Sequence, residues 1–323
     1  MLNKQPARAR VTRGTGARRL EEISCASAGK TGSCVAQELK LGDKVKVSGP
    51  LGSSYLRDEH AVPALLLAGG RWPLGAYAET FRFFEKESEV SYVVEMWQQP
   101  SLPVIGSKDR FPVRRIFCVG RNYVEHQKEM GGDGREQPFF FCKAAHDLVP
   151  VNAGESGKIH YAPMTANYHW ETEMVALIGI GGRNIAAERA NDHVWGYAVG
   201  LDMTRRDLQQ QGKDKGRPWS FGKDFDQAAP CGPVTPASKI GHPSKGKLWL
   251  KVNGEFRQQS DIDQMIWSVP EQIAFLTQYY TLEVGDVIFT GTPAGVGAAK
   301  AGDELVAAID GLGELRVSVV APR

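Results

Sequence analysis

Three acidic residues stand at the ends of apolar runs that are typical of buried strands. Glu171 and Glu173 lie at the head of the run 174–178, and Asp202 follows the run 196–201. In a strand, residues i and i+2 point to the same face, so Glu171 and Glu173 would place two carboxylates side by side. Two like charges this close raise each other's pKa unless a cation lies between them.

Carboxylate ligands without a cysteine or histidine of suitable spacing favour a hard divalent cation, Mg²⁺ or Mn²⁺, with water or substrate oxygens completing the coordination. The alternative is that Glu171 and Glu173 lie on a solvated face. For an isolated pair with this common spacing, the solvated face is the better interpretation. The rest of the sequence decides between the two.

The elements that must position these acids are mainly strands. "KLWLKVNGEFRQQ" predicts two strands around Asn253-Gly254, a pair that type I′ hairpin turns favour, and "DELVAAIDGLGELRVSVV" repeats this pattern around Asp310-Gly311. From about residue 112 onward hairpins outnumber helices, and strands do not alternate with helices in the Rossmann manner. The pattern predicts an α+β fold with a mostly antiparallel or mixed sheet.

One helix is well marked between the two hairpins. Ser268 is a suitable N-cap, Pro270 fits the first turn, and Glu271 has the capping-box position. Ile273 and Leu276 then give the helix an apolar face.

Composition excludes several classes of function. The 323 residues are 42% hydrophobic and 24% charged, and 39 Lys and Arg against 37 Asp and Glu give a formal charge of +2. This balance favours neither nucleic acid nor a membrane as a partner. No apolar stretch approaches the roughly 18 residues that span a bilayer. The five cysteines are an odd number without CxxC spacing, which indicates no disulfide framework and no zinc knuckle and fits a reducing cytoplasm.

Residues 1–90 differ from the rest of the chain. Residues 1–20 are rich in arginine and poor in apolar residues, which predicts a disordered basic tail. Residues 39–70 resemble a short stretch of the flavin-dependent ferredoxin reductases of aromatic-ring dioxygenases, without the Arg-x-Tyr-Ser motif and nucleotide loop of those proteins. A segment this short cannot enclose a flavin, so we interpret it as a non-catalytic remnant. An unrelated small sheet is the alternative.

Seven sequence blocks in a fixed order resemble the fumarylacetoacetate hydrolase family over roughly residues 90–323. They are "RIFCVGRNYVEHQKEM", "PFFFCKAAHDLV", "HWETEMVALIG", "GYAVGLDMTRRDLQ", "GKDFDQAAPCGP", "LWLKVNGEFRQQSDIDQMIWSVPEQI" and "EVGDVIFTGTPAGVG". The blocks "PFFF", "GLDMTRRDLQ" and "KGRPW" are closest to the bacterial fumarylpyruvate hydrolases of the gentisate pathway. The resemblance implies a catalytic domain over residues 91–323, with a mixed β-roll or sandwich-like sheet core, a few helices and a small N-terminal extension.

The same resemblance assigns roles to individual residues. The metal-binding triad of the family falls on Glu171, Glu173 and Asp202, the acids that the charge pattern selects. The family's lysine, which can hold developing negative charge, falls on Lys223. The resemblance therefore favours a Mg²⁺ or Mn²⁺ site over a solvated face.

The family also carries a His and a Glu three residues apart, matched here by His126 and Glu129. If "NYVEHQKEM" is helical, with Asn122 as N-cap and Glu125 in the capping-box position, the two side chains face the same way. The carboxylate would orient the imidazole and raise its basicity, so that His126 takes a proton from water near neutral pH. The alternative is an ordinary contact on a helix surface.

Polar groups suited to an anionic substrate complete the implied site. Arg206 and Gln209 follow the third acid and, by resemblance, face the site. Thr292 lies in a glycine-rich turn, where hydroxyl and backbone N–H groups suit a carboxylate. Arg121 and Lys143 are secondary candidates for substrate binding.

Two positions depart from the family's pattern. Trp170 replaces the second of two histidines that often precede the acidic pair, which alters the edge of the site. Ala144 stands where relatives tend to have proline, which frees the local backbone and would loosen the segment. Neither change removes a catalytic group, so activity is expected.

The activity that the resemblance implies is metal-dependent hydrolysis of a carbon–carbon bond in a small 2-oxo or 1,3-diketo acid, with 3-fumarylpyruvate giving fumarate and pyruvate. The same triad also supports oxaloacetate decarboxylation and the decarboxylation or isomerisation of homoprotocatechuate breakdown. Outside the family, residues 39–70 suggest a flavin-linked electron-transfer protein, whose pure form would be yellow. The resemblance further implies a homodimer formed through the catalytic domain.

Overall fold

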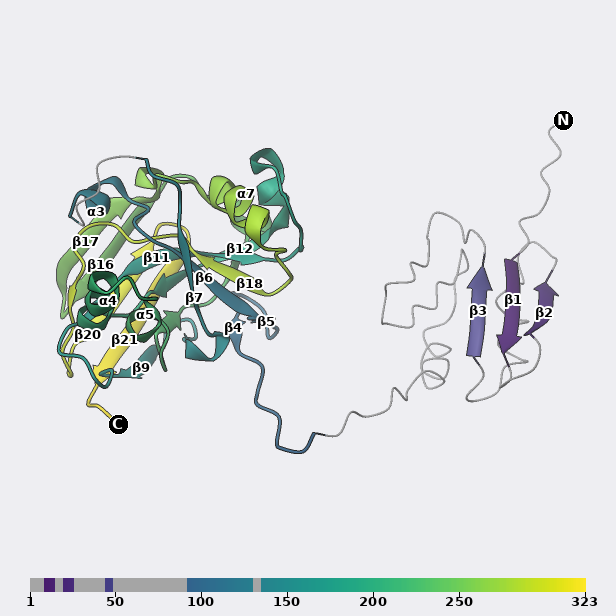
Figure 1. Cartoon of the computed structure of the whole chain (residues 1–323), viewed down its shortest axis with the longest axis horizontal. Coiled ribbons are helices and arrows are strands. Elements are labelled where there is room, and N and C mark those ends of the chain that lie inside the picture. Colours follow the sequence, from purple (N-terminus) through teal and green to yellow (C-terminus); the bar gives the residue numbers. More distant parts are fainter. Residues whose placement is uncertain (1–8, 15–19, 26–43, 49–91, 130–134) are drawn as a thin grey trace. The chain divides into compact units, whose positions relative to one another are not determined.

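The computed structural model describes residues 9–14, 20–25, 44–48, 92–129 and 135–323 (Figure 1). The chain divides into two units, Met1–Met96 and Trp97–Arg323. Apart from residues 44–48, the segment 39–70 that resembles a reductase lies outside the described residues. Within the described part, no helix is both long and apolar enough to cross a bilayer.

The described strands of the first unit form one antiparallel sheet. They are β1 (Ala9–Gly14), β2 (Leu20–Cys25) and β3 (Lys44–Ser48), in the order β2-β1-β3. The prediction of a disordered tail is therefore wrong for residues 9–14. In the strand register, Val11 pairs with Ile23 on one side and with Val47 on the other, and residues of these types favour strands.

A mixed eight-stranded sheet forms the centre of the second unit. Its main path runs β7-β6-β18-β11-β12-β14-β8, and the short strand β15 (Thr235–Pro236) pairs with β12. The strands are β6 (Arg115–Val119), β7 (Phe140–Lys143), β8 (Leu148–Pro150), β11 (Thr172–Ile178), β12 (Val194–Leu201), β14 (Ala229–Cys231) and β18 (Asp286–Phe289). Pairs β6·β18 and β8·β14 are parallel and the others antiparallel, which confirms the α+β class with a mixed sheet.

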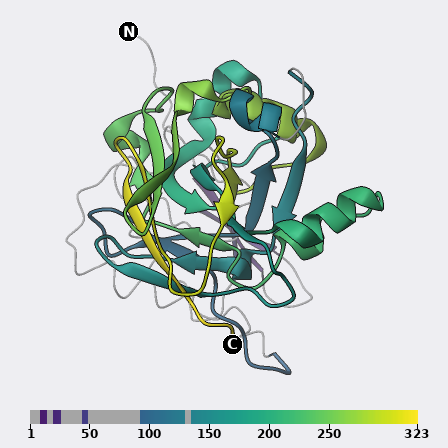
Figure 2. The same cartoon turned by 90° about the vertical axis from the view of Figure 1, so that its left-hand side faces the viewer.

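A second sheet of five strands runs in the order β17-β16-β20-β21-β9. Its strands are β9 (Ser156–His160), β16 (Lys247–Val252), β17 (Glu255–Asp261), β20 (Glu304–Ile309) and β21 (Gly313–Val320). The yellow ribbon of β20 and β21 marks this sheet in Figures 1 and 2. Both predicted hairpins are present in it, β16 with β17 and β20 with β21.

The two hairpin turns differ from each other. Asn253 and Gly254 have φ values of +51° and +85°, as the predicted type I′ turn requires. The second turn is longer, because Ile309 pairs with Gly313 across three residues, and Asp310 does not adopt a positive φ. A two-residue turn at Asp310-Gly311 was therefore the wrong prediction.

Strand β11 is buried on both faces, which explains the unbroken apolar run after the acids. Met174 and Ala176 belong to the core that also contains Leu250 of the second sheet. Val175 and Leu177 face a second core on the other side of the strand. The acidic residues thus begin a strand that offers no solvated face.

Short helices and small sheets cover the ends of these strands. The helices are α3 (Val124–Glu129), α4 (Arg206–Asp214), α5 (Ser220–Lys223), α6 (Ala237–Ile240) and α7 (Val269–Tyr279), and the 3₁₀ turns are Ala145–Asp147, Ala187–His193 and Ile262–Gln264. The small sheets are β4 (Ser101–Pro103) with β5 (Arg110–Pro112), and β10 (Tyr168–Trp170) with β13 (Thr204–Arg205) and β19 (Gly297–Ala298).

The helix predicted from its capping signals is α7. Ser268 and Glu271 form the capping box, with the Ser268 N–H donating to the Glu271 carboxylate at 2.9 Å. Ile273 and Leu276 are buried. Both parts of the prediction are confirmed.

Candidate metal and catalytic site

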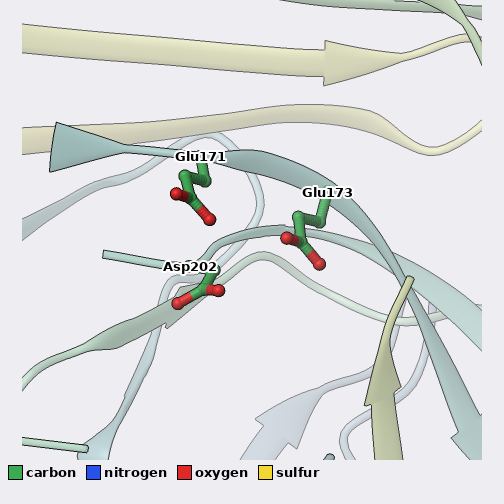
Figure 3. Close-up of side chains that lie close together, drawn as sticks. All are labelled: Glu171, Glu173 and Asp202. Atoms are coloured by element: carbon green, nitrogen blue, oxygen red, sulfur yellow. The ribbon is translucent and has the colours of Figure 1, made fainter. Parts of the chain in front are cut away.

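The three predicted acids meet at the ends of the two central strands. Glu171 lies between β10 and β11, Glu173 is in β11, and Asp202 directly follows β12. The Asp202 N–H donates to the Glu171 carbonyl at 2.8 Å, which fixes the two chain segments against each other. One oxygen of each carboxylate lies within 4.8 Å of the others, and all three residues are buried. Figure 3 shows the carboxylates turned toward a common space.

Two buried lysines balance part of this negative charge. Lys223 Nζ, at the end of α5, lies 2.8 Å from Glu171 Oε2 and 2.7 Å from both Asp202 Oδ2 and Thr204 Oγ1. Lys143 Nζ, at the end of β7, lies 2.8 Å from Asp202 Oδ1 and also donates to two backbone carbonyls. Lys143 was expected to bind substrate. Its side chain has no exposed surface, and it pairs with Asp202 instead of lining the cavity.

Arg206, the first residue of α4, joins the same network. Its Nη2 binds Glu171 Oε1, and its Nη1 donates to Gln209 Oε1 at 2.8 Å. Its Nε lies 3.5 Å from His169 Nδ1. Burial and the nearby Arg206 charge lower the pKa of His169 to about 4, so this imidazole is neutral at physiological pH. Arg206 therefore reaches the predicted site, but its charge is directed at an acid of the triad.

The acids of the triad differ in how well their charge is compensated. Burial raises the pKa of Glu171, but Lys223 and Arg206 outweigh burial and hold that pKa below its ordinary value. Burial and the two neighbouring acids raise the pKa of Glu173 well above its ordinary value, although the Gly291 N–H donates to its Oε2 at 2.8 Å. A divalent cation held among the three carboxylates would supply the missing charge, and the all-oxygen donor set fits Mg²⁺ or Mn²⁺.

The loop after β18 approaches the triad from the other side. Gly291 has a φ of +100°, and a Cβ there would lie 2.6 Å from the Asn122 Cβ, so both the conformation and the space require glycine. The next residue, Thr292, is buried, and its Oγ1 accepts a hydrogen bond from Gln258 Nε2 at 2.9 Å. Thr292 is thus placed at the site, as expected.

Gln258 of β17 is a residue that sequence reasoning missed. Its Oε1 accepts from the Thr172 N–H at 3.0 Å, between the two glutamates, and its Nε2 donates to Thr292 and to the Pro293 carbonyl. Gln258 therefore ties the ligand strand to the loop after β18. The sequence "EFRQQ" does not show which of its two glutamines is buried. The structure buries Gln258 and leaves the neighbouring Gln259 exposed.

Helix α3 carries the predicted base. His126 is buried and lines the cavity described below. The side chain of Glu129 lies outside the described part, so the His126–Glu129 pair stays a prediction. Asn122 is not the N-cap, because α3 begins at Val124 and the Asn122 side-chain amide donates to the carbonyls of Trp267 and Thr290.

A cavity that is partly open to solvent lies over this cluster. Most of the predicted residues line it, namely His126, Glu171, Glu173, Arg206, Gln209, Lys223, Thr292 and Arg121. Residues not predicted to belong to the site also line it, among them Lys213, Trp219, Phe139 and Phe141. The aromatic residues belong to the blocks "PFFF" and "KGRPW". These blocks resemble the family, but the sequence alone does not show that their side chains line the cavity.

Comparison with known proteins agrees with this geometry. The family profile described as "Fumarylacetoacetate (FAA) hydrolase C-terminal" matches residues 115–320, more than half of the chain. The chain belongs to the fumarylacetoacetate hydrolase family.

Three relatives from this family are informative. A fumarylpyruvate hydrolase of Ralstonia sp. is 44% identical over 185 residues, which are 57% of this chain and 93% of the relative. The mitochondrial oxaloacetate tautomerase of Homo sapiens is 42% identical over 209 residues, 65% of this chain and 93% of the relative. The crystal structure of fumarylpyruvate hydrolase from Pseudomonas aeruginosa in complex with Mn²⁺ and pyruvate is 54% identical, with a TM-score of 0.71, and covers 72% of this chain and 100% of that chain.

The two departures from the family's pattern leave the acids in place. Trp170 is buried, and its Nε1 donates to the Gly295 carbonyl at 3.3 Å. Ala144 was expected to loosen its segment, but its backbone N–H donates to Asp224 Oδ1 at 2.8 Å. A proline there would have no N–H to form this bond, so the change to alanine adds a tether.

Proposed function

We propose that this member of the fumarylacetoacetate hydrolase family is a metal-dependent hydrolase that cleaves 3-fumarylpyruvate to fumarate and pyruvate. The observation that carries the proposal is one cavity lined by His126 and by the carboxylates of Glu171 and Glu173, with Asp202 beside them. A proton acceptor and a cation site thus share one space. The fumarylpyruvate hydrolases that are 44% and 54% identical support the choice of substrate.

Glu171, Glu173 and Asp202 would hold the divalent cation, which when bound supplies Lewis-acid polarisation of oxygen atoms at the pyruvate end of the substrate. His126 takes a proton from a water molecule, whose oxygen adds to the carbonyl carbon of the acyl group. The bond between that carbon and the methylene carbon of the pyruvate part then breaks. The electron pair leaves with the methylene carbon, which accepts the proton that His126 holds. One water is consumed and no other reactant is needed.

Gln209 suits the negative charge that develops on the acyl oxygen better than Lys223 does. Lys223 Nζ already donates three hydrogen bonds, to Glu171, Asp202 and Thr204. Gln209 uses its Oε1 to accept from Arg206, which leaves its side-chain N–H groups available on the cavity side. Lys223 then acts by keeping the acids ionised and fixed.

We also propose that residues 1–90 take no part in catalysis, because every residue assigned to the site lies between residues 121 and 292. The odd number of cysteines supports a reducing cytoplasm as the compartment. The resemblance to enzymes of gentisate breakdown supports that pathway, and a homodimer is proposed on the same ground.

Turnover of fumarylpyruvate by the purified full chain tests the proposal. With Mn²⁺ or Mg²⁺ we expect loss of the substrate's enol absorbance and one fumarate and one pyruvate for each substrate, and with EDTA no turnover. His126→Ala should lower kcat by about 10²-fold or more. The control His146→Ala removes an exposed imidazole and should have no effect. Full turnover by His126→Ala would remove the proposed base.

Oxaloacetate is the second candidate substrate, because a tautomerase acting on it is 42% identical. Oxaloacetate enol–keto exchange and decarboxylation should therefore be followed with the same protein. If oxaloacetate is converted while fumarylpyruvate persists, the substrate proposal is wrong and the metal site stands.

A further inference from the structure

Lys213, in the last turn of α4, is a cation without an acidic partner. It lines the same cavity as the triad, and its side chain forms no ion pair or hydrogen bond with any described residue. Its Nζ lies 5.0 Å from the centroid of the Trp219 ring. Burial and the positive charge of Arg121, followed by Arg206, lower the pKa of Lys213 to about 8. Lys213 and Arg121 repel each other in the cavity, and an anion bound there would be attracted to both of them.

Arg121 is the second cation of this pair. Its φ of +54° is unusual for any residue except glycine and is retained at a cost, as is common in functional sites. Its Nε is buried and has no hydrogen-bond partner among the described residues. Glu136 lines an adjoining cavity with Arg121 but lies beyond ion-pair distance. The guanidinium is therefore held at the cavity with its charge unpaired.

The other cations of the site are already paired. Lys143, Lys223 and Arg206 each contact a carboxylate of the triad. Arg121 and Lys213 contact none of them. The positive charge that remains for a substrate is thus carried by Arg121 and Lys213, which both line the cavity.

A series of aromatic contacts links Lys223 to Lys213. Lys223, which binds the triad, lies 4.9 Å from the centroid of Phe141. The Phe141 ring lies 6.1 Å from the ring of Trp219, which in turn carries Lys213. Phe139 packs edge-on against Trp219 at 5.4 Å. The contacts thus run from Lys223 through Phe141 and Trp219 to Lys213, and Phe141 and Trp219 line the cavity with apolar rings on which a flat conjugated chain can lie.

We propose that Arg121 and Lys213 bind a terminal carboxylate on the acyl group, so that the enzyme selects acylpyruvates whose acyl end is anionic. The inference rests on the proposed function and names the part of the substrate that Arg121 and Lys213 bind. A carboxylate can accept two parallel bonds from the guanidinium and a third from the ammonium, which satisfies the unpaired donors. An acyl group ending in methyl would leave both cations unpaired in a partly buried place, and the site would discriminate against it.

The test compares two substrates that differ only at the terminal group of the acyl chain. Fumarylpyruvate and crotonylpyruvate share the enoyl group and the pyruvate part, and crotonylpyruvate has a methyl group in place of the terminal carboxylate. For Lys213→Met we expect the ratio of kcat/KM for fumarylpyruvate to that for crotonylpyruvate to fall by about tenfold or more. Lys215→Met, one position beyond the same helix and exposed, should leave the ratio unchanged. Arg121→Asn should also lower this kcat/KM ratio, because it removes the guanidinium. Asparagine is chosen because it tolerates the positive φ at this position.

A binding measurement makes the result independent of turnover. Calorimetric titration of the Mn²⁺-loaded full chain with fumarate and with crotonate should show fumarate binding weakened about tenfold by Lys213→Met and crotonate binding weakened much less. Equal loss for both ligands, or for neither, would overturn the assignment of Arg121 and Lys213. If fumarate binding responds as expected while the wild-type protein does not consume fumarylpyruvate, the anion site stands and the proposed reaction fails.

Discussion

Replacing Gln258 by methionine should weaken both the fold and metal binding. The side chain is fully buried and forms three hydrogen bonds, accepting from the Thr172 N–H and donating to Thr292 Oγ1 and the Pro293 carbonyl, at 2.9 to 3.0 Å. Methionine has nearly the same volume and can replace none of these bonds. The perturbation therefore removes polar contacts while it keeps the core filled.

The size of the effect follows from these contacts. A buried hydrogen bond contributes about 1 kcal/mol net, and a stranded partner costs about 1 to 3 kcal/mol. The Thr292 hydroxyl can turn toward the cavity, but the Thr172 N–H and the Pro293 carbonyl cannot reach water. We expect a loss of about 3 kcal/mol in the free energy of unfolding. Because Thr172 lies between Glu171 and Glu173, the metal dissociation constant should rise by roughly 10-fold to 100-fold, as for other partners that orient metal ligands.

Urea unfolding measures the first effect, and titration of the metal-stripped protein with Mn²⁺ measures the second. Gln259→Met is the matched control, because Gln259 is the exposed neighbour on the same strand. A variant that loses stability but binds Mn²⁺ within twofold of wild type would show that Gln258 supports the fold without positioning the ligands. Equal effects from the control would refute the role of its hydrogen bonds.

Three further results are expected. Burial and Asp224 raise the pKa of Asp147 to about 7, so the folded form binds a proton that the unfolded chain loses near pH 4, and stability falls as pH rises through this range. Asp147→Asn should therefore gain on the order of 3 kcal/mol in urea unfolding at pH 8 and little at pH 4; an equal gain at both would contradict this. Because the pKa of Lys213 is about 8, kcat/KM for fumarylpyruvate should fall above that pH, and this step should be absent in Lys213→Met. Mn²⁺ should raise the unfolding temperature of the wild-type protein, and an equal rise in Glu173→Gln would argue against the carboxylate site.

The acids of the site could be predicted because their signal is local. Two glutamates at alternate positions before an unbroken apolar run describe a buried strand with two carboxylates on one face, and β11 has that form. Asp202 has the same local signature at the end of β12. The capping box of α7 and the Asn253-Gly254 turn were likewise readable from neighbouring residues.

The partners of the acids could not be predicted, because they depend on tertiary contacts. Nothing near Lys143 in the sequence shows that its ammonium group lies behind Asp202, 59 positions along the chain from it, without contact to the cavity. Asn122 has the sequence of an N-cap but bonds to the carbonyls of Trp267 and Thr290. Lys213 carries no distinguishing pattern, and only its position at the cavity separates it from the exposed Lys215.

The proposed anion site gives a physical basis for choosing between two substrates. Fumarylpyruvate hydrolases match this chain at 44% and 54% identity, and an oxaloacetate tautomerase matches it at 42%, so relatives with both reactions share much of this sequence. In the proposed mechanism, the triad acts on the 2-oxo acid part that both substrates share. Oxaloacetate carries its second carboxylate only one carbon beyond that part, whereas fumarylpyruvate carries it at the end of a flat unsaturated chain. If Arg121 and Lys213 bind the distal carboxylate as proposed, the longer acid is the one expected to lie along Phe141 and Trp219, which line the cavity. Substitutions of Arg121 and Lys213 should therefore change the preference between fumarylpyruvate and oxaloacetate, while the affinity for metal stays the same.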